Sequence, residues 1–232
     1  MLVVHVSGGE AMEQIAAARA KGLRVFGETC PQYLFLTAAD LDLDGFEGAK
    51  HICSPPPRDA ASQETVWRGL MNGTFQVFSS DHAPFRYNGD TGKKVKGDSA
   101  SFVHVPNGIP GVETRLPLLF SEGVGKGRIS LQQFVALTST NPARLYGLYP
   151  RKGTIAIGGD ADLVIWDQTR EVTIDNDMLH HNVDYTPYAG RKVTGWPETV
   201  ISRGEVIIED DTLHAEKGRG AFLECGFPDT MI

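Results

Sequence analysis

Residues 2–30 read LVVHVSGGEAMEQIAAARAKGLRVFGETC, and this stretch decides the fold class. Residues 2–7 are rich in β-branched side chains and predict a strand that is buried on both faces. Residues 10–21 are mostly strong helix formers, and Gly22 follows them as a C-terminal cap. Residues 23–30 predict a second strand. A strand, a helix and a strand joined by short glycine turns form a βαβ unit, which requires a parallel sheet in an α/β fold.

The same alternation continues further along the chain. Residues 51–57 (HICSPPP) predict a short strand that stops at three prolines, residues 61–73 an amphipathic helix, and residues 74–81 (TFQVFSSD) another strand. The polar stretch from about 88 to 110 predicts a long connection. Further helices are expected over roughly 111–123, 130–138 and 141–148.

After Gly153 the pattern changes to alternating apolar and polar residues with glycine turns, as in residues 205–210 (EVIIED). Such alternation predicts antiparallel strands without intervening helices. We therefore expect three parts: residues 1–150 as an α/β domain with a parallel sheet, residues 151–213 as a smaller antiparallel β unit, and residues 214–232 as a C-terminal arm.

Composition excludes several classes of function. The 232 residues are 41% hydrophobic and 22% charged, and the net charge of −7 argues against a nucleic acid or an acidic membrane as partner. No apolar run approaches the roughly 20 residues that a membrane span needs. The three cysteines are widely spaced and form no CxxC pair, so they indicate neither a zinc knuckle nor a disulfide framework, and they favour a reducing cytoplasm.

Polar and titratable residues follow the predicted parallel strands at their C-terminal ends. His5 lies in the first strand, Glu28 at the end of the second, Ser54 at the end of the third, and Asp81 at the end of the fourth. Active sites of α/β barrels and open parallel sheets lie at this edge. A neutral histidine with a carboxylate oxygen suits Zn²⁺ or a similar divalent cation, so His5 and Asp81 are candidate metal ligands.

Each of these residues also has a plain structural interpretation. His5 could be a core histidine bonded to a backbone carbonyl, and Asp81 could be a helix N-cap or half of a salt bridge. Glu28 could act in the site or pair with an arginine near the sheet edge. Ser54 precedes a rigid proline triplet, which either leaves its backbone open to a polar ligand or ends a strand. Asn107-Gly108 is by itself a tight-turn signal.

The remaining titratable residues are interpreted as structural. The lysines at 93, 94 and 96 are expected in a solvent-exposed loop, and His180-His181 as a surface pair. His82 and His104 are expected to be loop or supporting residues.

Five motifs in order make the interpretation specific. They are VVHVSGGEAM, GETCPQYLFL, HICSPPPRDAASQETVWRGL, FSSDHAPF and VPNGIPGVETRLPLL. Together they resemble the C-terminal half of the bacterial dihydropyrimidinases and D-hydantoinases, cyclic-amide hydrolases of the amidohydrolase superfamily. The resemblance implies an α/β fold: the C-terminal part of a metal-dependent (β/α)8 barrel plus the C-terminal part of a small β-sandwich domain.

The resemblance also implies a site and a reaction. Members of this family carry two divalent metal ions, usually Zn²⁺, bridged by a carboxylated lysine. By motif, His5 and Asp81 match metal ligands, Asp81 also handles the proton of the attacking hydroxide, and Ser54 and Asn107 match substrate-binding positions. The implied partner is a small cyclic amide, hydrolysed to an N-carbamoyl amino acid, and the implied assembly is a homo-oligomer, a tetramer or a dimer.

The chain departs from the family pattern in its ligand set. It contains no HxH pair, and neither the bridging lysine nor the first single histidine has a matching motif. We therefore expect a C-terminal piece of a longer enzyme that is inactive and unstable alone. Two alternatives stay open. One is a non-catalytic scaffold of the collapsin-response-mediator type, and the other is another cyclic-amide hydrolase such as an allantoinase, although CSPPPRD and ETCPQYL favour the dihydropyrimidinase branch.

Overall fold

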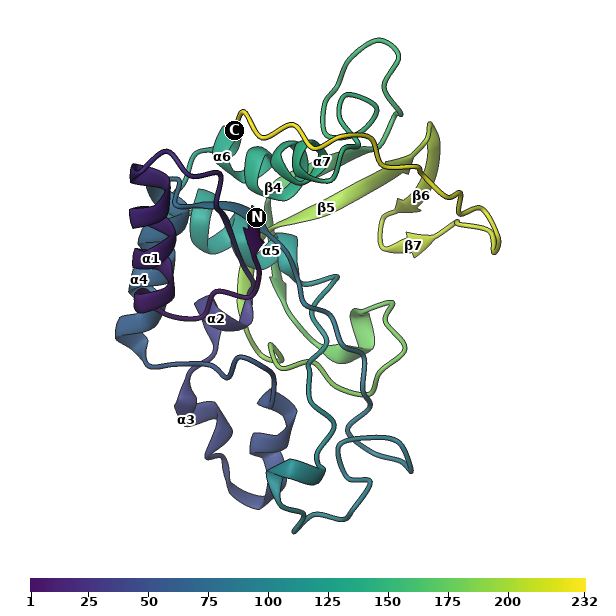
Figure 1. Cartoon of the computed structure of the whole chain (residues 1–232). Coiled ribbons are helices and arrows are strands. Elements are labelled where there is room, and N and C mark those ends of the chain that lie inside the picture. Colours follow the sequence, from purple (N-terminus) through teal and green to yellow (C-terminus); the bar gives the residue numbers. More distant parts are fainter. The chain divides into compact units, whose positions relative to one another are not determined.

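The computed structural model describes residues 1–232, and its chain divides into two compact units (Figure 1). Unit 1 consists of Met1–Leu118 and Thr173–Lys192, and unit 2 of Leu119–Val172 and Val193–Ile232. Each unit thus takes its residues from two separate parts of the chain. The boundaries near residues 151 and 214 describe a change of sequence pattern, and they stay predictions.

Unit 1 contains a parallel sheet of three strands in the order β1-β2-β3: β1 (Leu2–Val3), β2 (Phe26–Thr29) and β3 (Phe75–Phe78). This arrangement confirms the predicted βαβ unit. The prediction of a first strand over residues 2–7 buried on both faces was wrong, because β1 is an edge strand of two residues and Val4 is 48% exposed. The strand cannot continue through His5, whose φ of 56° lies in the left-handed region.

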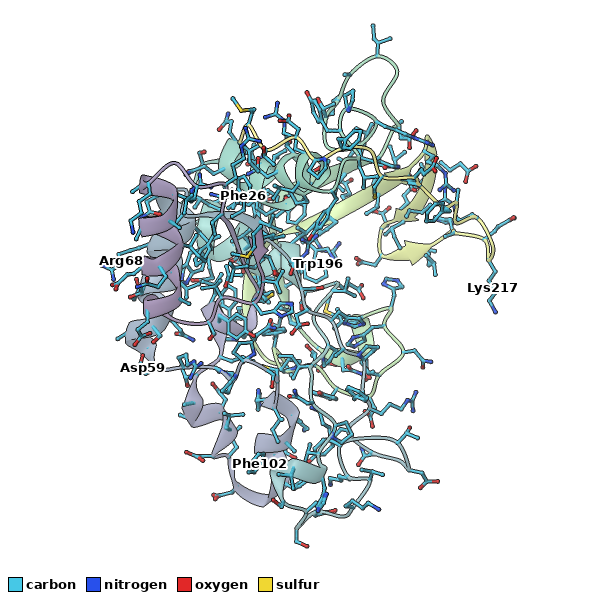
Figure 2. All side chains as sticks on the ribbon, viewed as in Figure 1. Phe26, Asp59, Arg68, Phe102, Trp196 and Lys217 are labelled. Atoms are coloured by element: carbon cyan, nitrogen blue, oxygen red, sulfur yellow. The ribbon has the colours of Figure 1, made fainter.

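Two predicted helices are confirmed and pack against each other, α1 (Gly9–Ala20) and α4 (Ala60–Met71) (Figure 1). At the start of α4 the carboxylate of Asp59, labelled in Figure 2, accepts a hydrogen bond of 2.8 Å from the backbone N–H of Ser62. This is a standard helix N-cap. Within α4, Gly69 allows close packing, because a Cβ there would lie 2.4 Å from the ring of Phe75.

Short helices connect β2 to α4, namely α2 (Gln32–Phe35), α3 (Ala38–Leu41) and the 3₁₀ helix η1 (Asp44–His51). The prediction of a strand over residues 51–57 was therefore wrong. His51 is the last residue of η1, and the three prolines that follow have no N–H to donate to a sheet. The long connection predicted after β3 contains the 3₁₀ helix η2 (Phe102–His104).

The helices predicted between residues 111 and 148 are present but shorter. They are α5 (Arg115–Leu119), the π-helix η3 (Phe120–Val124), α6 (Leu131–Val135), the π-helix η4 (Ala136–Thr140) and α7 (Asn141–Leu145). In unit 2 the rings of Phe120, Phe134 and Trp166 form an aromatic cluster, with centroids 4.8 to 5.9 Å apart. Edge-to-face and tilted contacts of this kind stabilise a core beyond the area that they bury.

The second sheet has four strands in the order β4-β5-β6-β7: β4 (Leu163–Thr173), β5 (Lys192–Ser202), β6 (Glu205–Glu209) and β7 (Thr212–Leu213). The pairs β5–β6 and β6–β7 are antiparallel, as the alternating pattern predicts. A 3₁₀ turn, η5 (Asn176–Met178), lies between β4 and β5. No helix of the chain combines the length and apolar character needed to cross a membrane.

Candidate active site

His5 and Asp81, the two predicted metal ligands, lie close together just beyond the C-terminal ends of β1 and β3. His5 Nε2 is 3.5 Å from Asp81 Oδ1, and the two side chains are 32% and 28% exposed. Both residues have left-handed backbones, with φ of 56° and 46°. Such strained positions are rare for residues other than glycine and cluster at functional sites, where the surroundings hold them in place. The sheet topology therefore brings the predicted pair together with both side chains accessible.

Glu28 holds the backbone of His5 in this conformation. One of its oxygens, Oε2, accepts a hydrogen bond of 3.0 Å from the His5 N–H, and the other, Oε1, accepts one of 3.1 Å from Cys30 Sγ and one from the Ser79 hydroxyl. Glu28 is only 2% exposed, so these donors replace the water that a carboxylate would otherwise bind. Glu28 therefore supports the backbone of His5, and its charge also acts on the buried guanidinium of Arg115, so both of its sequence interpretations stay open.

Burial and neighbouring charges set the protonation of these groups. The pKa of Asp81 is raised, chiefly by burial, although His5 opposes the shift and Glu28 adds to it. Burial also raises the pKa of the Cys30 thiol far above its usual range, and the Glu28 charge adds to this effect.

The ligand atoms of His5, Glu28 and Cys30 lie within 4.8 Å of one another, which is a distance compatible with one metal ion. Glu28 and Cys30 are buried and take part in hydrogen bonds within the chain, which makes them less accessible for a ligand role. His5 and Asp81 fit it, because an imidazole nitrogen and a carboxylate oxygen face each other with their side chains partly exposed. Two ligands are fewer than the three or four that zinc takes from a protein.

Ser54 and Asn107, the two predicted substrate-binding residues, are also brought together. Asn107 Nδ2 donates a hydrogen bond of 2.8 Å to Ser54 Oγ, and both residues are exposed. A backbone hydrogen bond of 3.0 Å from the Gly108 N–H to the Ile52 carbonyl joins the same two segments. The pair therefore presents polar side chains and backbone to solvent, within the unit that carries His5 and Asp81.

His82 connects the Asp81 segment to the segment after Asn107. Its Nδ1 accepts hydrogen bonds from the N–H groups of Gly111, at 3.1 Å, and Val112, at 3.4 Å, so the ring proton lies on Nε2. Burial lowers the pKa of His82, which favours this neutral form. His82 thus links these two segments, and its supporting role in a site stays a prediction.

A cavity of about 470 Å³ lies beside His82. Its lining residues are His82, Pro84, Val112, Glu113, His180, His181 and Asn182. His180 is an exposed residue whose Nδ1 lies 2.7 Å from Glu113 Oε1, and His181 Nε2 lies 2.9 Å from Asn176 Oδ1.

The prediction of a solvent-exposed loop for the lysines was wrong for Lys93, which is completely buried. Its ammonium group donates to three backbone carbonyls that flank Ser54 and Asn107. Sequence reasoning missed this residue because a lysine in a polar stretch is usually solvated. Lys96, three residues later, is exposed as expected.

Known proteins are similar to this chain over nearly its whole length. The model of the amidohydrolase family matches residues 4–207. The chain is 49% identical over 224 residues to a D-hydantoinase of Geobacillus stearothermophilus, covering 97% of this chain and 47% of that protein. It is 43% identical over 222 residues to a D-hydantoinase of Ralstonia pickettii, covering 96% and 48%.

Solved structures give the same result. A crystal structure of D-hydantoinase superposes with a TM-score of 0.93 at 47% identity, covering 97% of this chain and 48% of that one. The dihydropyrimidinase of Brevibacillus agri NCHU1002 superposes with a TM-score of 0.88 at 47% identity, covering 92% and 45%. These matches confirm the predicted α/β class, a partial α/β barrel. The chain spans about half the length of the relatives that it matches.

Proposed function

This chain belongs to the amidohydrolase family, and we propose that it supplies part of the active site of a cyclic-amide hydrolase of the dihydropyrimidinase or hydantoinase type. The observation that carries the proposal is the 3.5 Å approach of His5 Nε2 to Asp81 Oδ1 at the ends of parallel strands. The substrates are 5,6-dihydropyrimidines or 5-substituted hydantoins, and the products are N-carbamoyl amino acids. The names of the relatives, D-hydantoinase and dihydropyrimidinase, support this substrate class.

His5 and Asp81 hold a divalent cation in this proposal. When bound, such an ion would lower the pKa of a water molecule, so that the water can attack at neutral pH, and would polarise the ring carbonyl. Asp81 accepts the proton of the attacking water and passes it to the ring nitrogen as the C–N bond breaks, so the net change is addition of one water.

Ser54 and Asn107 bind the ring amide. Hydantoin and dihydropyrimidine rings present two N–H donors and two carbonyl acceptors in a fixed arrangement, so their recognition needs acceptors and donors at fixed positions. The exposed pair joined by a hydrogen bond of 2.8 Å offers such a surface. Glu28 acts indirectly, because it fixes the backbone that carries the His5 imidazole.

Finer features are part of the same proposal. The metal is zinc, two ions are bound, and a carboxylated lysine bridges them. The ligands missing from residues 1–232, that lysine among them, come from protein outside this sequence. The whole enzyme is a cytoplasmic homo-oligomer, a tetramer or a dimer.

Complementation tests the proposal directly. Residues 1–232 are co-expressed with the amino-terminal half of the D-hydantoinase of G. stearothermophilus, which is 49% identical to this chain over the matched region. Hydrolysis of dihydrouracil and of a 5-substituted hydantoin is measured, together with the metal content. We expect activity from the complex and none from the chain alone. Two metals per chain and hydrolysis by residues 1–232 alone would contradict the assignment of the missing ligands.

Variants then test the residues. Asp81→Asn and His5→Ala are expected to lower activity of the complex by at least 10²-fold, on the order of what a positioned proton carrier contributes. Asp98→Asn is the matched control, because Asp98 is an aspartate of the same unit with a side chain that is 70% exposed. A folded, oligomeric complex without metal or activity would instead favour the scaffold function.

A further inference from the structure

Lys93 is a buried cation with a complete set of backbone partners. Its side chain has no exposed surface, and Nζ donates to the carbonyls of Pro106 and Gly108, both at 2.7 Å, and of Ile52, at 3.1 Å. An ammonium group has three N–H donors, so all three are used. A buried charge is retained only when its hydrogen bonds are satisfied in this way.

The three carbonyls belong to the two segments that present the proposed substrate-binding residues. Ile52 lies two positions before Ser54, and Pro106 and Gly108 lie on either side of Asn107. One ammonium group therefore joins the segments from beneath, while the bond between Asn107 Nδ2 and Ser54 Oγ joins them at the exposed face.

The same arrangement continues toward Asp81. Ile109, the next residue after Gly108, forms an isolated parallel bridge with His82, and its carbonyl accepts a hydrogen bond of 2.9 Å from the Ala83 N–H. The Lys93 backbone is itself held, because its N–H donates to the Arg86 carbonyl at 2.7 Å. A displacement of residues 106–108 would therefore also shift the backbone beside Asp81, the proposed metal ligand.

We propose that Lys93 is a positioning residue of the hydrolase, which holds the Ser54 and Asn107 segments at the separation that the ring amide requires. The role depends on the proposed function, since it concerns the substrate surface of that site. Lys93 does not touch the substrate, because its ammonium group is covered by the three carbonyls. Its removal is expected to weaken substrate binding far more than the chemical step.

The test compares Lys93→Met with Lys96→Met in the complementation complex. Methionine has similar length without the charge, and Lys96 is an exposed lysine of the same connection. For Lys93→Met we expect KM for dihydrouracil to rise at least tenfold and kcat to change less than threefold. For Lys96→Met we expect both constants to stay within twofold of the unsubstituted complex. An unchanged KM, or a fall in kcat alone, would overturn the proposal.

Amide hydrogen exchange gives a readout that does not depend on catalysis. The Gly108 N–H, bonded to the Ile52 carbonyl, is expected to exchange slowly in the unsubstituted protein and at least tenfold faster in Lys93→Met. Rapid exchange in the unsubstituted protein, or unaltered exchange in the variant, would overturn the proposal. If Lys93→Met does not fold, Lys93→Gln, which keeps a shorter N–H donor, is judged by the same criteria. If no cyclic amide is hydrolysed, the proposed function fails, while exchange still decides whether Lys93 holds the segments.

Discussion

The buried ammonium group of Lys93 predicts a dependence of stability on pH that the Lys93→Met variant should lack. Burial lowers the pKa of Lys93 from the ordinary lysine value of 10.5 to about 8, and the nearby Cys53 thiol partly opposes the shift. Below pH 8 the lysine is charged in both the folded and the unfolded states, and folding bears the full cost of burying the charge. Between pH 8 and 10.5 the unfolded state binds more protons, so stability rises with pH in this window.

The size of the effect follows from the shift. A change of one pKa unit corresponds to about 1.4 kcal/mol, so the shift of Lys93 corresponds to roughly 3 kcal/mol in the free energy of unfolding. Because the unfolded lysine is still largely protonated at pH 10, most of this gain, about 2–3 kcal/mol, falls between pH 7 and pH 10. No discount for solvent screening applies, since the side chain has no exposed surface.

Urea unfolding of the complementation complex at pH 7, 8, 9 and 10 measures the effect. Only the difference between the unsubstituted protein and Lys93→Met is interpreted, so that tyrosines and thiols titrating in both proteins largely cancel. Relative to Lys93→Met, we expect the free energy of unfolding of the unsubstituted protein to rise by about 2–3 kcal/mol between pH 7 and pH 10. An NMR titration of labelled lysine side chains checks the pKa itself. A constant difference, or a Lys93 pKa near 10.5, would refute the reasoning.

Three further predictions concern other parts of the chain. Glu28→Gln should weaken binding of Zn²⁺ to the complex by roughly 10- to 100-fold, measured by titration calorimetry, because supporting residues of metal ligands commonly contribute that much; an unchanged affinity would contradict the role of Glu28. Gly69→Ala should lower the free energy of unfolding by about 1–3 kcal/mol in urea, because its Cβ would lie 2.4 Å from the Phe75 ring, whereas Gly220→Ala, with no atom within 4 Å, should have little effect. Ser130→Ala removes the N-cap of α6 and should cost about 1 kcal/mol in the same assay, and no loss would show that the cap is dispensable.

Local sequence signals were sufficient to predict those elements whose structure depends on residues that are neighbours in the sequence. The helices α1 and α4 lie within two residues of their predicted bounds, because helix formers and capping residues act over one or two turns. The parallel order of β1, β2 and β3 follows from the helical connections between strands, which leave few topologies open. The turn-rich alternation after Gly153 likewise predicted antiparallel pairs.

The residues of the candidate site were predictable for a different reason. Polar side chains at the ends of apolar strands are costly unless they are used, so His5 and Asp81 could be singled out, and the family resemblance added Ser54 and Asn107. Only the structure shows that His5 lies beside Asp81 and that Ser54 lies beside Asn107. Distances between separate segments depend on the whole fold and not on any one segment.

By itself, the sequence determined the α/β class of this protein, its main helices and the residue types available for chemistry, since these depend on local propensity and on periodicity. Tertiary structure alone decided two other features: His5 interrupts its strand, and Lys93 is buried. Each depends on partners distant in sequence, such as the Glu28 carboxylate behind His5 and the three carbonyls around Lys93. A local pattern contains no information about such partners, because only the folded chain brings them within hydrogen-bonding distance.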